Sequence, residues 1–114
     1  MKIIKGDMGG RYTPPGHDQN VESRSIIKTD TDIHVTTFPP QAGMEEEIHP
    51  GHAQVFYVLS GCMSVRQGGM EIGRLKEGDA VYIPAGDPHE VKNDTGEGLI
   101  FLAVTYPETS DGNY

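Results

Sequence analysis

Carboxylate and histidine residues that could bind a metal ion alternate in one short segment of the chain. Glu45, Glu47 and His49 are spaced two residues apart, and a β-strand places such residues on one face. Pro50 and Gly51 limit this segment to six residues, too few for a stable helix. We therefore predict a strand over 44–49 that presents these three side chains together.

Other candidate ligands lie at the starts of later strands. Gln54 begins the next predicted strand, and His89 follows a turn. A barrel that brought these strand ends together would gather Glu47, His49, Gln54 and His89 around one metal ion, with His52 as a further candidate. Two imidazoles combined with oxygen ligands suit one divalent transition metal (Mn, Fe, Ni, Co or Zn) better than Ca or Mg. Glu45 and His52 are candidates for proton transfer beside it.

Most of these candidates have a structural alternative. His89 could be buried and satisfied by the backbone, while Glu47 belongs to an acidic run that could be a solvated face. Gln54 could be a hydrogen-bonding residue of a site that has lost its metal, and His52 could belong to a turn.

The remaining histidines and the cysteine carry weaker signals. His17 follows a Pro-Pro-Gly turn and is interpreted as a surface residue, with a role in the pocket as the alternative. His34 alternates along a strand and is interpreted as structural. Cys62, the single cysteine, is interpreted as a small strand residue.

The elements that must position these residues are short strands. Gly and Pro contribute 15 and 8 residues, which favours many turns over long helices. Strand signals recur along the chain at 26–27, 33–38, 44–49, 54–59, 62–67, 70–75, 80–83, 89–92 and 99–106. This spacing predicts an all-β sandwich or barrel.

The length of 114 residues corresponds to one domain. Residues 1–25 are polar and turn-rich, and we expect an extended N-terminal arm. Residues 26–107 form the predicted β-barrel, and 108–114 a flexible C-terminal tail.

Charge and composition restrict the partners. Seventeen acidic and nine basic residues give a net charge of −8, which disfavours nucleic acid and anionic membranes. No apolar run reaches the roughly 20 residues of a membrane-spanning helix, and the first residues do not resemble a signal peptide. With one cysteine and no internal disulfide, we expect a cytoplasmic protein.

The run Val55-Phe56-Tyr57-Val58-Leu59 is apolar without alternation. Such a run predicts burial on both faces of the strand. One face would line the barrel, and a second subunit would cover the other, so we expect a homodimer.

Two motifs resemble those of the cupin superfamily. Gly78-x5-Pro84-x-Gly86-x2-His89-x3-Asn93 matches the second cupin motif at each fixed position, and His49-x4-Gln54-x6-Gly61 is similar to the latter part of the first. With the strands between them, the resemblance covers about 38–105. It implies a double-stranded β-helix, or jelly roll, of two antiparallel sheets.

The first motif departs from the usual pattern. Cupins usually carry His-x-His followed by Glu, whereas this chain has Glu47-x-His49 followed by Gln54. The ligand charge stays at −1, as if the carboxylate had moved from one position to another.

Three functions follow as alternatives. The first is a metal-binding cupin that binds or converts a small polar molecule, carbohydrate-like or a keto or carboxylic acid. As an enzyme it would be a dioxygenase, isomerase, lyase or decarboxylase. The second is a non-catalytic binding or sensor cupin with a metal-poor site, supported by the altered first motif. The third is an interaction module, against which a well-formed cavity would count.

Overall fold

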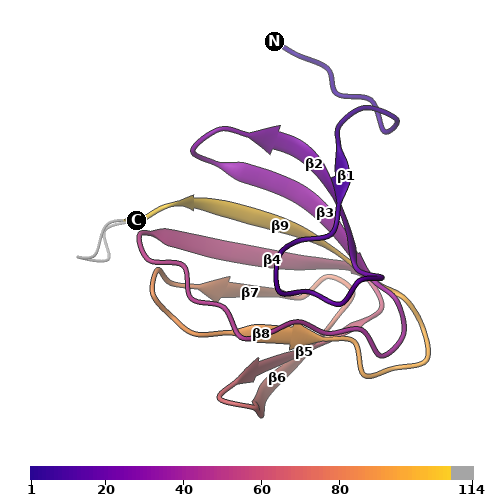
Figure 1. Cartoon of the computed structure of the whole chain (residues 1–114), viewed down its shortest axis with the longest axis vertical. Coiled ribbons are helices and arrows are strands. Elements are labelled where there is room, and N and C mark those ends of the chain that lie inside the picture. Colours follow the sequence, from indigo (N-terminus) through magenta and orange to yellow (C-terminus); the bar gives the residue numbers. More distant parts are fainter. Residues whose placement is uncertain (109–114) are drawn as a thin grey trace.

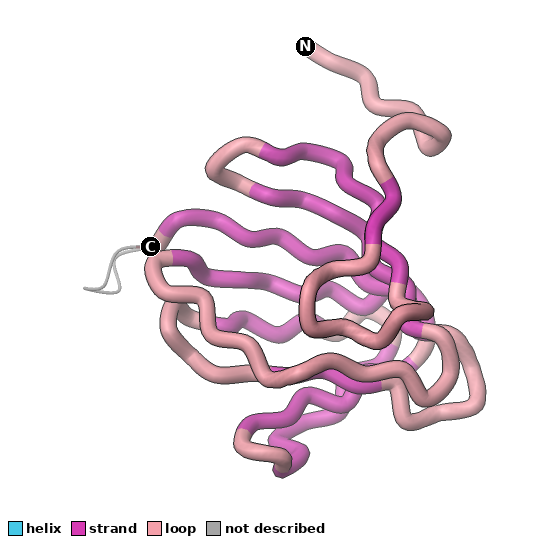
Figure 2. Tube along the Cα trace, viewed as in Figure 1, coloured by secondary structure: helices cyan, strands magenta, loops and turns pink. Residues whose placement is uncertain are grey.

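The computed structural model describes residues 1–108, which form two antiparallel sheets (Figure 1). The larger sheet has the strand order β1-β2-β3-β9-β4-β7, and the smaller one β6-β5-β8. The strands are β1 (Arg11–Tyr12), β2 (Glu22–Lys28), β3 (Asp32–Phe38), β4 (His52–Ser60), β5 (Cys62–Gln67), β6 (Met70–Lys76), β7 (Ala80–Ile83), β8 (Glu90–Lys92) and β9 (Leu99–Pro107). Figure 2 shows strands and loops but no helix in this part of the chain. The predicted all-β jelly roll of two antiparallel sheets is confirmed.

The core forms from alternate residues of the central strands. Phe38, Phe56, Val58 and Phe101 are at most 5% exposed and belong to one hydrophobic cluster, together with Met63 of the smaller sheet. Burial of each such side chain stabilises the fold by roughly 1.5–3 kcal/mol. The inward face of β4 thereby fixes the direction of Gln54, two residues before Phe56.

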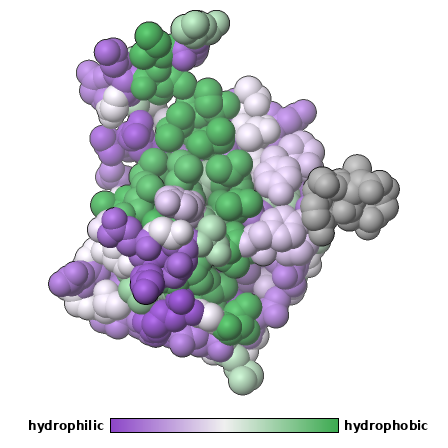
Figure 3. Space-filling model, turned by 180° about the vertical axis from the view of Figure 1, so that it is seen from behind, coloured by the Kyte–Doolittle hydropathy of each residue, from purple (hydrophilic) through white to green (hydrophobic). Residues whose placement is uncertain are grey.

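The outer face of the larger sheet is also apolar. Tyr57 and Leu59 remain 43% and 42% exposed, and Tyr57 lies opposite Leu102 of β9 and Ala80 of β7. Seen from behind, the molecule carries a broad hydrophobic band (Figure 3). Within this chain the run 55–59 therefore alternates, with Phe56 and Val58 inside.

The predicted strand over Met44–His49 is wrong. This segment makes only two isolated bridges, between Met44 and His17 and between Glu47 and His89. Its amides pair with different segments, since Glu45 N donates to Gly16 O (2.8 Å) and Glu47 N to His89 O (2.8 Å). A continuous ladder with one neighbour therefore does not form.

The N-terminal region is more ordered than the sequence indicates. β1 and most of β2 lie within the predicted arm, and β2 begins at Glu22 and pairs with β3. At the other end, Glu108 is buried and accepts hydrogen bonds from Tyr82 Oη and Ala85 N. The rest of the predicted tail, 109–114, lies outside the described residues.

The Asn93 side chain joins the end of β3 to the loop between β8 and β9. It is fully buried, and Nδ2 donates to the carbonyls of Phe38 (3.0 Å), Pro39 (3.2 Å) and Glu97 (2.6 Å). Its Oδ1 accepts from the amide and the hydroxyl of Thr95. The last fixed residue of the second motif is therefore a structural clamp.

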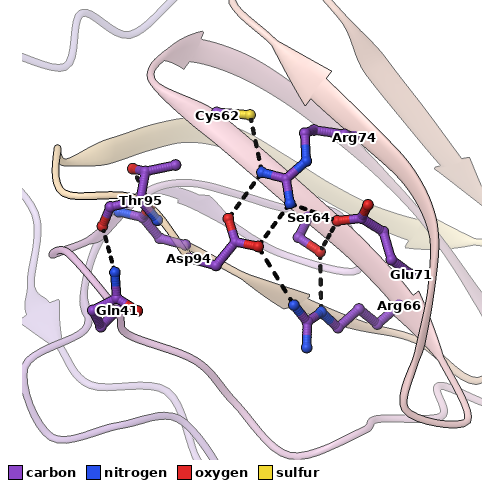
Figure 4. Close-up of polar contacts among 9 residues, drawn as sticks. Gln41, Cys62, Ser64, Arg66, Glu71, Arg74, Asp94 and Thr95 are labelled. Carbon is purple, nitrogen blue, oxygen red and sulfur yellow. Dashed lines mark hydrogen bonds and ion pairs between the residues drawn. The ribbon is translucent and has the colours of Figure 1, made fainter.

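The smaller sheet carries a charged network on its surface (Figure 4). Arg74 donates to both carboxylate oxygens of Asp94 (2.8 and 2.7 Å) and to Glu71 (2.8 Å). Its hydrogen bond holds the pKa of Asp94 below the usual value. Cys62 Sγ accepts a longer contact from Arg74 (3.7 Å), so the thiol lies in this network rather than in the core.

Candidate functional site

A cavity of about 400 Å³ opens beside the inner face of the larger sheet. Volumes of this size accommodate small molecules. Four of the five histidines in the chain line it, namely His17, His34, His49 and His52. The fifth, His89, has its ring centroid 5.4 Å from that of His49. The fold therefore gathers the histidines from four separate segments.

Backbone pairing aligns the two predicted motifs. Glu47 and His89 exchange both hydrogen bonds, N to O at 2.8 and 3.0 Å. Gly86 N also donates to His49 O (3.1 Å). Gly86 has a φ of 81°, in the left-handed region that glycine adopts without strain. Its hydrogen bond to His49 O connects the turn before His89 to the segment that carries His49.

Glu47 and His49 form a close polar pair. Glu47 Oε2 lies 3.3 Å from His49 Nε2. Burial lowers the pKa of His49, the negative charge of Glu47 opposes this shift, and His89 and His52 reinforce it. The net shift is downward, which favours the neutral imidazole that can donate an electron pair.

His89 is buried with one nitrogen unpartnered. The residue is 4% exposed, and Nδ1 lies 3.0 Å from the carbonyl oxygen of Asp87. Because a carbonyl only accepts, Nδ1 carries the proton and Nε2 holds the lone pair. No hydrogen-bond partner of Nε2 is present among the described residues.

Gln54 has the matching feature on β4. It is 8% exposed, and Nε2 donates to Thr105 Oγ1 (2.9 Å). Its Oε1 is buried and has no partner in the described part of the chain. An unsatisfied buried group costs roughly 1–3 kcal/mol, and native structures seldom carry one without a reason.

The two candidates for proton transfer are placed differently. His52 lines the cavity. Glu45 lies outside it and lines a second depression with Gly16, Asp18, Arg66 and Lys92. Because residues 44–49 do not form a strand, the side chain of Glu45 does not share a face with those of Glu47 and His49.

The acidic and histidine side chains do not by themselves form a closed metal cage. Within residues 1–108, no group of three or more His, Cys, Asp or Glu side chains is arranged to hold a metal ion. The side chains nearest the proposed ligand atoms instead combine imidazoles and the Glu47 carboxylate with the Gln54 amide, while Asp30 and Asp32 lie elsewhere on the cavity wall. The two unpartnered atoms of this group, Gln54 Oε1 and His89 Nε2, are both electron-pair donors and fit a metal.

Sequence reasoning missed two residues of the cavity wall. Asp32 and His34 on β3 lie on the inward face, and Asp32 Oδ1 is 3.1 Å from His34 Nδ1. The signal was available, since His34 precedes the buried Thr36 by two residues and Phe38 by four. His34 was interpreted as structural because it alternates with Val35 along a strand.

The sequence profile of the family described as Cupin domain matches residues 34–105, more than half of the chain. This chain belongs to the cupin family. The resemblance of the two motifs is thereby confirmed. Among curated proteins, no sequence matches this cupin significantly.

Solved structures share the fold of this cupin. A predicted oxalate decarboxylase from Thermotoga maritima is 21% identical with a TM-score of 0.81, over 95% of this chain and 100% of that one. KdgF from Halomonas sp. is 20% identical with a TM-score of 0.76, covering 97% of both chains. The polyketide cyclase RemF from Streptomyces resistomycificus is 23% identical with a TM-score of 0.77, over 92% and 78%. These identities establish a common fold and leave the activity to be argued from the site.

Proposed function

We propose that this cupin binds one divalent transition metal (Mn, Fe, Ni, Co or Zn) through Glu47, His49, Gln54 and His89. The observation that carries the proposal is the pair of buried, unpartnered donor atoms, Gln54 Oε1 and His89 Nε2. The hydrogen bond from His89 Nδ1 to Asp87 O (3.0 Å) fixes the tautomer that a ligand requires, as in many metal sites. His52 on the cavity wall is a further candidate ligand.

We propose that the cavity takes a small polar molecule, carbohydrate-like or a keto or carboxylic acid. Its wall carries Tyr12, Lys28, Asp32 and Thr36 besides the histidines, which supply hydrogen-bond donors and acceptors. The neighbours include a predicted decarboxylase and a cyclase, both named for the conversion of small molecules. This chemistry agrees with the polarity of the wall.

If the protein is an enzyme, the reaction would be that of a dioxygenase, isomerase, lyase or decarboxylase. The metal would supply Lewis-acid or redox chemistry at a bound oxygen atom. His52 is the better candidate for moving a proton there, because it lines the cavity and Glu45 does not.

The alternative is a non-catalytic binding or sensor cupin with a metal-poor site. It is favoured by the lack, within 1–108, of a preformed cluster of three His, Cys, Asp or Glu ligands. In this case Gln54 and His89 would bind the small molecule directly through the same two atoms.

We also infer a cytoplasmic homodimer that binds neither nucleic acid nor membranes. The exposed apolar side chains of Tyr57 and Leu59 support a second subunit on the outer sheet face. The net charge of −8 supports the exclusion of polyanionic partners. Residues 1–108 contain no helix long and apolar enough to cross a membrane.

Metal content of freshly purified protein, measured by mass spectrometry, tests the proposal. Near-stoichiometric metal that is absent from the variant His89→Ala and retained by His34→Ala would support a metal cupin. Wild-type protein without metal, and without uptake of any of the five ions after purification, would overturn it in favour of the metal-free alternative.

A further inference from the structure

The backbone of the N-terminal arm is fastened beside the proposed metal ligands. Glu45 N donates to Gly16 O (2.8 Å), and Asp18 N donates to Gly43 O (3.0 Å). The Asp18 carboxylate also accepts from Gly43 N (2.8 Å). These bonds hold the chain on both sides of His17, whose backbone forms a bridge to Met44. The position of His17 is therefore determined by the fold.

The His17 ring points inward in a defined tautomer. Its side chain is only 9% exposed, and the ring meets Phe38 edge-on with centroids 5.7 Å apart. Nδ1 lies 2.9 Å from the carbonyl oxygen of Pro15, so this nitrogen carries a proton, and Nε2 is the nitrogen that can offer a lone pair in the neutral ring. His89 is held by the same arrangement, through Asp87 O.

His17 Nε2 faces the same carboxylate as His49. Glu47 Oε1 lies 3.8 Å from His17 Nε2, and Glu47 Oε2 lies 3.3 Å from His49 Nε2. Donor atoms that share one ion at about 2.1 Å are separated by roughly 3.0–3.4 Å in octahedral or tetrahedral sites. The Glu47–His49 separation lies within this range, whereas the Glu47–His17 separation exceeds it by about 0.4 Å, so ligation by His17 requires a small movement of its ring toward the ion. Both rings line the cavity, and His17 also borders the second depression.

We infer that His17 is a further nitrogen ligand of the metal site, contributed by the N-terminal arm. The inference rests on the proposed metal-binding function and extends its ligand set beyond the two sequence motifs. Because His17 belongs to the arm and the other ligands to the barrel, metal binding would join the two parts. The arm would then become more resistant to unfolding when metal is bound.

Cobalt titration tests this assignment, with Co²⁺ as a spectroscopic probe. His17→Gln removes the imidazole and keeps a polar side chain, and it should weaken Co²⁺ binding by at least about tenfold. His34→Gln is the matched control, because His34 lines the same cavity but contacts Asp32, and it should bind Co²⁺ as the wild type does. Thermal unfolding without metal checks that both variants fold.

A second variant separates ligation from mere positioning of Glu47. In His17→Cys, a coordinated thiolate would produce a sulfur-to-cobalt charge-transfer band, because cysteine binds metals as the thiolate. The wild type should lack this band, since Cys62 contacts Arg74 on the smaller sheet. Protease digestion should also show that Co²⁺ protects residues 9–20 in the wild type and not in His17→Gln.

Failure of the His17 assignment can be distinguished from failure of the proposed metal site. If His89→Gln loses Co²⁺ while His17→Gln binds it unchanged, the metal site stands and the role of His17 is overturned. Weaker binding by His17→Gln without a charge-transfer band in His17→Cys would also overturn ligation by His17. If the wild type does not bind Co²⁺, both the proposed function and this inference fall.

Discussion

At the residue scale, the proposed ligand set carries a single negative charge, on Glu47. Glu47 contacts His49 and faces His17, whereas Gln54 offers a neutral carbonyl oxygen from β4. An amide oxygen is a weaker donor to a divalent cation than a carboxylate is. The two positions should therefore respond in opposite directions to exchange between acid and amide.

Gln54→Glu should tighten metal binding, and Glu47→Gln should weaken it, each by roughly tenfold, which corresponds to about 1.4 kcal/mol. The first change adds a carboxylate and the second removes the only one assigned to the site. Competition of each variant with a chromogenic chelator for Zn²⁺ measures both effects. If neither variant differs from the wild type, the carboxylate assignment is wrong, and His52 becomes the better ligand.

Asp32 provides a residue-scale test that is independent of metal. Burial raises the pKa of its carboxyl, but the hydrogen bonds from Lys28 and His34 and their charges outweigh burial, and the net pKa is lower than the usual value for Asp. A lowered carboxyl pKa stabilises the fold above the unfolded-state value, and this stabilisation is lost as the pH falls through the folded-state pKa.

Asp32→Asn should therefore lower the free energy of unfolding at pH 7 by about 0.5–1 kcal/mol, a value reduced by solvent screening of a partly exposed pair. The difference from the wild type should begin to shrink as the pH falls below about 4 and should disappear once the carboxyl of the folded protein is protonated. Urea unfolding at pH 7, 5 and 3.5 measures it. Asp30→Asn in the adjoining turn is the control, and an equal, pH-independent loss in both variants would contradict the account.

At the element scale, the regular strands could be predicted from the sequence, and the irregular segments that connect them could not. The limits of Cys62–Gln67 and Ala80–Ile83 agree with the prediction, because turn residues end both strands. Met44–His49 looked like a strand by its alternation, but its amides bond to the arm and to His89. Such long-range backbone pairing cannot be predicted from a local sequence pattern. For the same reason, His17 was interpreted as a surface residue.

The loop after β8 gives the clearest prediction at this scale. Asn93→Ala should lower the free energy of unfolding by about 2–4 kcal/mol, because it leaves three carbonyl groups without their buried donor. Chemical unfolding measured by circular dichroism tests this. Asp94→Asn, the neighbouring change, affects only the exposed contacts with Arg74 and Arg66 and should cost much less. An equal decrease in the free energy of unfolding in both variants would show that the buried hydrogen bonds of Asn93 do not stabilise this loop.

At the scale of the whole molecule, the two faces of the larger sheet have different tasks. The inner face carries the core and the cavity, and the outer face exposes Tyr57 and Leu59. A hydrophobic band is visible when the molecule is seen from behind (Figure 3). The sequence indicated this through the unbroken run 55–59. A single chain covers only one side of that run, so the second side is available to another subunit.

The wild type should accordingly have twice the chain mass of 12.4 kDa in light scattering at micromolar concentration. Tyr57→Glu places a charge in the centre of the apolar face and should shift the mass to that of one chain. Ile72→Glu is the control, because Ile72 is 63% exposed on β6 of the smaller sheet. A wild-type monomer, or dissociation by Ile72→Glu alone, would contradict the proposed interface.

The central claim is that His89 Nε2 and Gln54 Oε1, which have no hydrogen-bond partner within residues 1–108, bind a metal ion. Calorimetric titration of the metal-stripped wild type and of His89→Ala with Zn²⁺ at pH 7.5 tests it most directly. The account predicts one ion per chain for the wild type and no measurable binding for His89→Ala, with both proteins folded. Equal binding by the two proteins, or none by the wild type, would contradict it.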